Sequence, residues 1–348
     1  MTAPTSTAAP EQRAPAPRAD VFSTLGQKIP DGLSISEALE FAGMANWNVR
    51  KVPHSQTITL PDGTTTEVSI PHTFTVLRDN PSTGLPDALG SVGRKWTPYQ
   101  NEDCANLLSD LHNMSGATPY SFGATNGGRK TFLSLKLPEG FNFRSPVTGN
   151  SDLTNLYLVV FNSHDGFGSL SANLTPIRMF CCNQQRMAES MARSRMLLRH
   201  TGDAETRLQM LREVLDESFS YHHTYQLACE AMIEAELDGD AVLAELNKLL
   251  RANDPDLTDR QRELRADTVG SVRALYEGSP TVAPFYGTRY GLYNAITEYT
   301  DHHMRVIVPD GGNEREIRAL RTLNNDQLDS FKQRAFAQLM PADVGLTD

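Results

Sequence analysis

Residues 156–182, LYLVVFNSHDGFGSLSANLTPIRMFCC, decide the fold because two apolar segments flank one polar cluster there. Residues 156–161 are apolar and include two β-branched valines, and residues 174–182 form a second apolar segment that carries one guanidinium, Arg178. Short apolar segments bounded by turn residues are typical of buried strands. The stretch therefore predicts two buried strands, which could pair as a hairpin.

The polar cluster between them, residues 162–166 (NSHDG), has more than one interpretation. Polar groups at the end of a buried strand could form a functional site, but Asn, Ser and Asp also hydrogen-bond the backbone of a tight turn. A sharper structural hypothesis is one buried polar network, in which Asp301 of a C-terminal helix pairs with an arginine such as Arg178. Its members would be Asn162, His164, Asp165, Arg178, Asp301 and His302.

The composition is that of an ordinary globular chain, with 348 residues, 39% hydrophobic and 21% charged. No apolar run approaches the roughly 20 residues that span a bilayer, and the N-terminus lacks a signal-peptide pattern, so we expect a soluble, cytoplasmic protein. The cysteines show no CxxC spacing, which favours structural thiols in a reducing compartment. They are Cys104, Cys181, Cys182 and Cys229.

The predicted fold class is α+β, with an antiparallel sheet of hairpins in the N-terminal half and a helical C-terminal half. Residues 1–30 are rich in Ala and Pro and predict a disordered tail, because they offer little apolar surface to offset the entropy of ordering. Residues 31–200 are expected to form the α+β sheet region. Residues 201–348 are expected to form a helical region packed on it.

Within the sheet region, Ser34 and Glu37 predict a capping box that starts a short helix ending near Gly43. Strand-like alternation follows over residues 47–92, with a turn at residues 61–63 (PDG). Residues 101–113 then have helical spacing, and the side chain of Asn101 is expected to cap that helix.

Residues 120–137 alternate in polarity on both sides of residues 126–128 (NGG), which predicts a β-hairpin with Arg129 and Lys130 at its tip. A glycine-rich basic tip could approach a phosphate backbone closely, although a surface hairpin with solubilising charges is the alternative. The chain contains neither a Walker loop nor a GxGxxG motif. In the C-terminal half, good helix formers predict helices over residues 183–199, 205–251, 266–277, 288–304 and 317–339.

The formal net charge of −10 argues against a protein that coats nucleic acid with its whole surface. One segment is nevertheless basic, since seven arginines face only three acidic residues between positions 178 and 212. Arginine binds phosphates in a bidentate manner, but it also serves ion pairs at subunit interfaces and solvated faces. The arginines are Arg178, Arg186, Arg193, Arg195, Arg199, Arg207 and Arg212.

Several spaced motifs together resemble the phage/plasmid-like protein family, the domain of unknown function numbered 932. They are residues 89–94 (LGSVGR), 99–101 (YQN), 162–166 (NSHDG), 176–178 (PIR), 182–183 (CN) and 288–302 (TRYGLYNAITEYTDH). The resemblance runs from about residue 34 to residue 303. It implies a protein encoded by a phage, plasmid or integrated element, working in the cytoplasm of the host cell.

The order of elements is also similar to that of the single-strand annealing superfamily of recombination proteins, whose rings hold single-stranded DNA in a basic groove. This resemblance implies a homo-oligomer that binds single-stranded nucleic acid, without a metal ion or other cofactor. Phosphate contacts would then come from Arg129, Lys130, Arg178, Arg186 and Arg193, and Tyr120 or Phe122 would stack on bases.

Two other functional classes stay open. His164 and Asp165 could join residues 301–303 (DHH) in a divalent-metal site, or His164 could activate Cys181 or Cys182, and either would make the chain an enzyme. Alternatively, the chain is a structural or assembly protein of a phage without catalysis, whose helical half makes subunit contacts.

Overall fold

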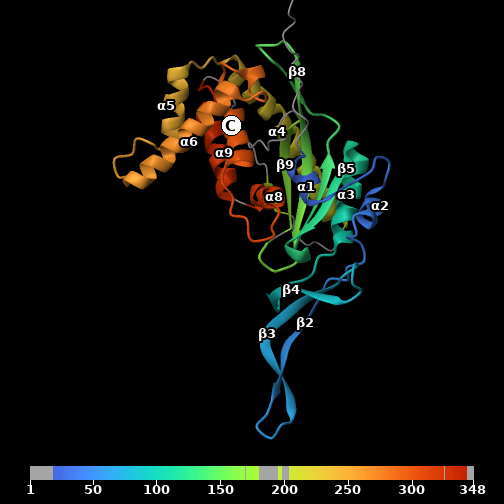
Figure 1. Ribbon diagram of the computed structural model, residues 1–348. Coiled ribbons are helices and arrows are strands. Elements are labelled where there is room, and N and C mark those ends of the chain that lie inside the picture. Colours follow the sequence, from blue (N-terminus) through green and yellow to red (C-terminus); the bar gives the residue numbers. More distant parts are fainter. Residues whose placement is uncertain (1–18, 169, 180–194, 198–203, 325, 343–348) are drawn as a thin grey trace, which may run out of the picture.

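A seven-stranded antiparallel sheet forms the centre of the protein, and the C-terminal helices gather to one side of it (Figure 1). The computed structural model describes residues 19–168, 170–179, 195–197, 204–324 and 326–342. This arrangement confirms the α+β class, with antiparallel sheets in the N-terminal half and helices in the C-terminal half.

The order of the central sheet is β1–β5–β6–β8–β9–β10, and β7 pairs with the first part of β8. The β8–β9 pairing places Val160 opposite Ala172 and so confirms the hairpin expected from residues 156–182. The strands are β1 (Gln27–Lys28), β5 (Thr118–Thr125), β6 (Lys130–Lys136), β7 (Phe141–Arg144), β8 (Ser151–Ser163), β9 (Ser171–Arg178) and β10 (Arg195–Leu197).

Both faces of this sheet are covered, which explains why residues 156–161 in the middle of β8 are apolar without interruption. Leu158 and Leu174 lie on the face covered by α3 (Asn101–Ser115) and α4 (Ala204–Glu234). Tyr157 and Val159 point to the other face and pack with residues of α1 (Val21–Leu25) and α8 (Glu314–Asn324). Neighbouring residues of one strand therefore serve two separate apolar clusters.

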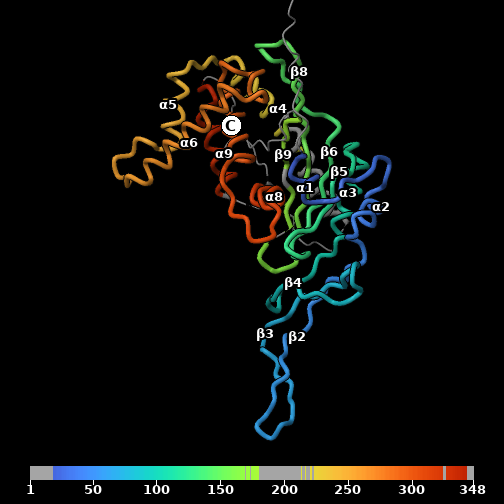
Figure 2. The backbone as a smooth tube through the Cα atoms, in the orientation of Figure 1, coloured from blue at the N-terminus to red at the C-terminus, as the bar shows by residue number. Residues whose placement is uncertain are grey.

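A second sheet, β2 (Arg50–Thr59), β3 (Thr65–Asp79) and β4 (Pro86–Gly93), forms an arm that projects from one end of the body (Figure 2). Its base contributes Val76, Leu89 and Val92 to the main core. Residues 55–72, in contrast, are all exposed.

The remaining helices are short or moderate in length. The Ser34–Glu37 capping box at the start of α2 (Ile35–Phe41) is confirmed, with the Ser34 amide donating to the Glu37 carboxylate at 2.8 Å. The other helical elements are η1 (Asn126–Gly128), α5 (Gly239–Leu250), α6 (Asp259–Gly278), η2 (Ala283–Phe285), α7 (Arg289–Glu298), the π-turn η3 (Tyr299–His303) and α9 (Asp326–Leu339).

Three expectations need correction. Residues 21–28 form α1 and β1 instead of a disordered tail, because Val21 and Phe22 supply apolar groups that bury and Asp20 caps the helix. Residues 195–197 pair with β9 as a strand, although residues 183–199 predicted a helix. The N-cap of α3 is Gln100, because the Asn101 side chain turns inward.

Candidate functional site

Three connections meet at the end of the central sheet that faces the arm (Figure 1). The His164 amide, in the β8–β9 loop, donates to the Arg129 carbonyl in the β5–β6 turn at 2.8 Å. Gly166 of the same loop lies against Val92 of β4, and a Cβ on Gly90 would come within 2.7 Å of the Asp165 carbonyl oxygen. The loop, the turn and the base of the arm are therefore tied to one another.

His164 lies at the centre of this junction and is fully buried. Its Nε2 is 3.2 Å from Asn101 Oδ1, while Asn101 Nδ2 donates to the Met44 carbonyl at 2.9 Å. Because Oδ1 accepts, Nε2 carries the proton, which leaves Nδ1 as a buried acceptor with no partner in the part of the chain that the structure describes.

The electrostatic surroundings keep the His164 ring neutral. Burial, and to a smaller extent the nearby Arg78 guanidinium, lower its pKa to about 4, although the Asp165 carboxylate opposes both effects. A neutral imidazole without solvent access cannot meet a substrate proton. The geometry therefore makes His164 a structural group of the junction rather than a general base.

Arg78 of β3 connects the arm to the end of the central sheet. Its guanidinium stacks over the Trp47 ring at 4.1 Å and pairs with Asp87 at 3.1 Å. It also covers Gly128 in the β5–β6 turn, where a Cβ would lie 2.4 Å from the arginine Nη1. Gly128 has a φ of +90°, so glycine is needed there both for the backbone and for the arginine above it.

The polar cluster of residues 162–166 forms a turn in which its own side chains are satisfied. The Asp165 carboxylate accepts from the Ser163 hydroxyl and, at 2.9 Å, from the Phe167 amide. Asn162 Nδ2 donates to the Tyr99 carbonyl at 3.0 Å. Asp165 is therefore buried and serves the turn through these two hydrogen bonds.

The outside of the junction is aromatic and basic. Phe167 is 88% exposed, and Arg129 is exposed in the neighbouring turn. Arg94 and Lys95 are exposed beyond β4, and Lys130 is half-buried. Their side chains form no ion pair within residues 19–168 or the other described ranges. We call Arg94, Lys95, Arg129, Lys130 and Phe167 the sheet-end rim.

Both ends of the connecting segment that carries Arg94 and Lys95 are held near the loop. Val92 contacts Gly166, and the Tyr99 carbonyl accepts from Asn162.

Sequence reasoning missed Phe167. The available signal was an aromatic residue between two glycines, Gly166 and Gly168, in a loop that has no core face to fill.

Two of the residues expected to contact nucleic acid are inside the protein, and a third is only partly exposed. Phe122 is fully buried in the main core, and the half-buried Tyr120 donates its hydroxyl to the Asp20 carboxylate. Arg178 is fully buried as well. In this fold Phe122 and Arg178 cannot reach a ligand, so we do not retain them as contacts. Arg186 and Arg193 lie outside the described residues.

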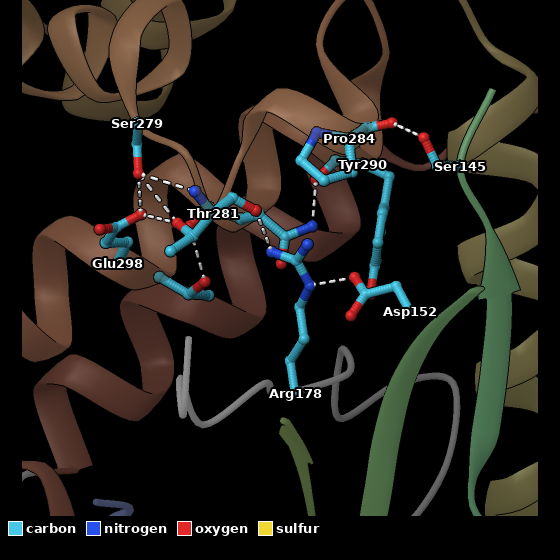
Figure 3. Close-up of polar contacts among 10 residues, drawn as sticks. Ser145, Asp152, Arg178, Ser279, Thr281, Pro284, Tyr290 and Glu298 are labelled. Carbon is cyan, nitrogen blue, oxygen red and sulfur yellow. Dashed lines mark hydrogen bonds and ion pairs between the residues drawn. The ribbon is translucent and has the colours of Figure 1, made fainter. Parts of the chain in front are cut away.

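Arg178 instead joins the sheet to the helical half (Figure 3). Its Nε pairs with Asp152 of β8, and Nη1 donates to the Thr281 carbonyl at 2.6 Å. Burial raises the pKa of Asp152, and the Arg178 charge only partly opposes this. On the helical side, Ser279 donates to the buried Glu298 carboxylate at 2.9 Å.

The single polar network expected from the sequence is divided among separate clusters. Asp301 pairs with Lys332 of α9, both buried, whereas Arg178 pairs with Asp152, so the expected partner of Asp301 is wrong. His302, in the π-turn, is half-buried. Among the described residues, no group of three or more His, Cys, Asp or Glu could hold a metal ion. Cys181 and Cys182 lie outside those residues.

The comparisons with known proteins give a family without an assigned activity. The model described as "Domain of unknown function (DUF932)" matches residues 88–336, more than two thirds of the chain, which therefore belongs to this family. The match covers the sheet-end rim as well as Arg178 and its partners Asp152 and Thr281. No curated protein and no solved structure matches the chain. Within the described residues, no helix has the length and apolar character needed to cross a membrane.

Proposed function

We propose that the protein binds single-stranded nucleic acid at the sheet-end rim. The observation that supports this proposal is the placement of Phe167, 88% exposed, beside cations that have no ion-pair partner among the described residues. Exposure of a large aromatic side chain to water is unfavourable in free energy, and this cost is removed when the ring packs against another apolar surface. The flat face of a nucleobase is such a surface.

The rim combines the two elements that single-strand binders use. Phosphates need local positive charge, and Arg94, Lys95, Arg129 and Lys130 provide it in a chain whose net charge is −10. An unpaired base can turn outward to stack on Phe167, whereas the bases of a duplex are already stacked on each other. The rim therefore favours single strands over duplexes.

The junction beneath the rim supports binding because it fixes the positions of its parts. The His164 amide connects the β8–β9 loop to Arg129, and Arg78 of the arm packs over Gly128. A preorganised site loses less conformational entropy on binding than a mobile one.

The biological role that we propose is strand annealing in the recombination or replication of a phage or other mobile element. This part rests on the resemblance in motifs and element order to the two families named in the sequence analysis. It requires no metal ion or nucleotide, since annealing needs only that two complementary strands be held with their bases accessible.

Fluorescence anisotropy with labelled single-stranded and duplex oligonucleotides, over a salt series, tests the proposal. We expect salt-sensitive binding with a preference for single strands, and Arg129→Gln/Lys130→Gln should reduce the salt slope by about 0.7 for each phosphate that the variant no longer neutralises. Stacking contributes about 1–3 kcal/mol per base, so Phe167→Ala should weaken binding roughly 5- to 150-fold.

The matched control is Phe41→Ala, which removes another exposed phenylalanine, 48% exposed, from α2. This control should bind like the wild type. Absence of binding at low salt, or equal losses of affinity in the Phe167 and Phe41 variants, would reject the proposed interface. A positive binding result would then justify an assay of complementary-strand annealing.

A further inference from the structure

The outer part of the arm carries an apolar face that nothing in the described part of the chain covers. Ile58, Leu60, Val68 and Ile70 are 39%, 38%, 46% and 47% exposed. The register places Ile58 opposite Thr66 and Val68 opposite Gln56. Because alternate residues of a strand share a face, the four apolar side chains all lie on one side of the ribbon. We call this side the arm face.

The opposite side of the ribbon is polar. It carries Thr57, Thr59, Thr65, Glu67 and Ser69. Apolar side chains gathered on one side are the pattern of strands with one buried face, yet every residue from 55 to 72 is exposed. A two-stranded ribbon by itself is marginally stable in water, and a second layer or further strands would stabilise it.

We propose that the arm face packs against the same face of a second copy of this chain. The charge distribution favours this partner. The carboxylates of residues 55–72 are Asp62, in the turn, and Glu67, on the polar side, so the arm face is uncharged. Two copies that each carry a net charge of −10 can meet there without bringing like charges into contact.

The position of the arm is also suitable for such pairing. It projects from the body, so two ribbons can stack as layers about 10 Å apart while the two bodies stay separate (Figure 2). The outer ribbon contains no lysine or arginine, so no cationic side chain would be buried between the two layers. Two amphipathic ribbons in contact would form a small β-sandwich.

The size of the arm face predicts a weak contact. Its four apolar side chains expose about 300 Å² per copy, near the size of the largest apolar patch on an ordinary monomer. Two such faces fall short of the roughly 1,200 Å² that stable complexes bury. We therefore expect a dimer that forms in the micromolar range and dissociates on dilution. This inference does not depend on nucleic-acid binding.

Sedimentation velocity of the full chain over a concentration series tests the inference. The wild type should move from monomer to dimer, and Ile58→Thr/Val68→Thr, which keeps β-branched residues but removes the apolar contact, should raise the dissociation constant roughly tenfold or more. The control Thr57→Ser/Thr65→Ser alters the polar side and should dimerise like the wild type.

A second measurement avoids dependence on variant stability. Leu60→Cys should form an intermolecular disulfide under mild oxidation, and Thr59→Cys, on the polar side, should do so much less. A wild type that stays monomeric throughout, an unchanged dimer in the Ile58/Val68 variant, or equal cross-linking of the two cysteine variants would overturn the inference. A monomer whose Ile58/Val68 variant loses oligonucleotide affinity would assign the arm face to nucleic acid instead.

Discussion

The buried imidazole of His164 should make the stability of the protein depend on pH. The ring is fully buried and its pKa is about 4, against an ordinary value of 6.5. Between these two values the unfolded chain binds a proton that the folded ring does not. The free energy of unfolding therefore has its full His164 contribution above pH 6.5 and loses it as the pH falls towards 4.

The size of this loss follows from the gap between the two pKa values. At about 1.4 kcal/mol per pKa unit, the gap corresponds to about 3 kcal/mol of stability lost on acidification. His164→Gln removes the titrating group, so the variant should be less stable than the wild type at pH 7 but should lose about 3 kcal/mol less between pH 7 and pH 4.

Urea unfolding followed by circular dichroism at several pH values measures this difference. Carboxylates also titrate between pH 4 and pH 7, but both proteins contain the same carboxylates, so their contribution cancels in the comparison. His223→Gln, which removes an exposed histidine, serves as the control and should keep the wild-type pH dependence. Parallel stability curves for the wild type and the His164 variant would refute the reasoning.

Two further substitutions test contacts at the two junctions. Arg178→Met leaves the Asp152 carboxylate buried without its arginine and should lower the free energy of unfolding in urea by about 3–5 kcal/mol. The double variant Asp152→Leu/Arg178→Met removes both charges and should recover part of that loss. A loss below about 1 kcal/mol in the single variant would contradict this expectation. Gly128→Ala should destabilise the protein by about 1–3 kcal/mol more than Gly127→Ala. Both positions have positive φ, but only a methyl group at position 128 would clash with Arg78. Equal losses would show that the Arg78 side chain moves aside at no cost.

The strands of the central sheet could be predicted because their signals are local. Residues 126–128 (NGG) fix the β5–β6 turn, and the apolar runs of residues 156–161 and 174–178 are long enough to identify β8 and β9. The same local pattern misled at residues 195–197, where good helix formers pair with β9 as a strand. Tertiary pairing outweighed helix propensity there.

The partners of the polar residues could not be predicted, because they come from distant segments. Asn101 meets His164 across 63 positions, and Thr281 meets Arg178 across 103. A guanidinium in a strand fits either a phosphate contact or a buried ion pair, and only the position of Asp152 on the neighbouring strand decides between them. Likewise, alternation over the arm predicted strands correctly but could not show that one face stays uncovered.

The central claim is that Phe167 meets a base, and Phe167→Trp tests it most directly. The protein has two other tryptophans, of which Trp47 is buried, so their emission can be subtracted with the wild type. We predict that a single-stranded oligonucleotide quenches the added indole at the concentrations at which anisotropy shows binding, and that Phe41→Trp shows no such change. Binding without quenching at position 167, or no binding at all, would contradict the account.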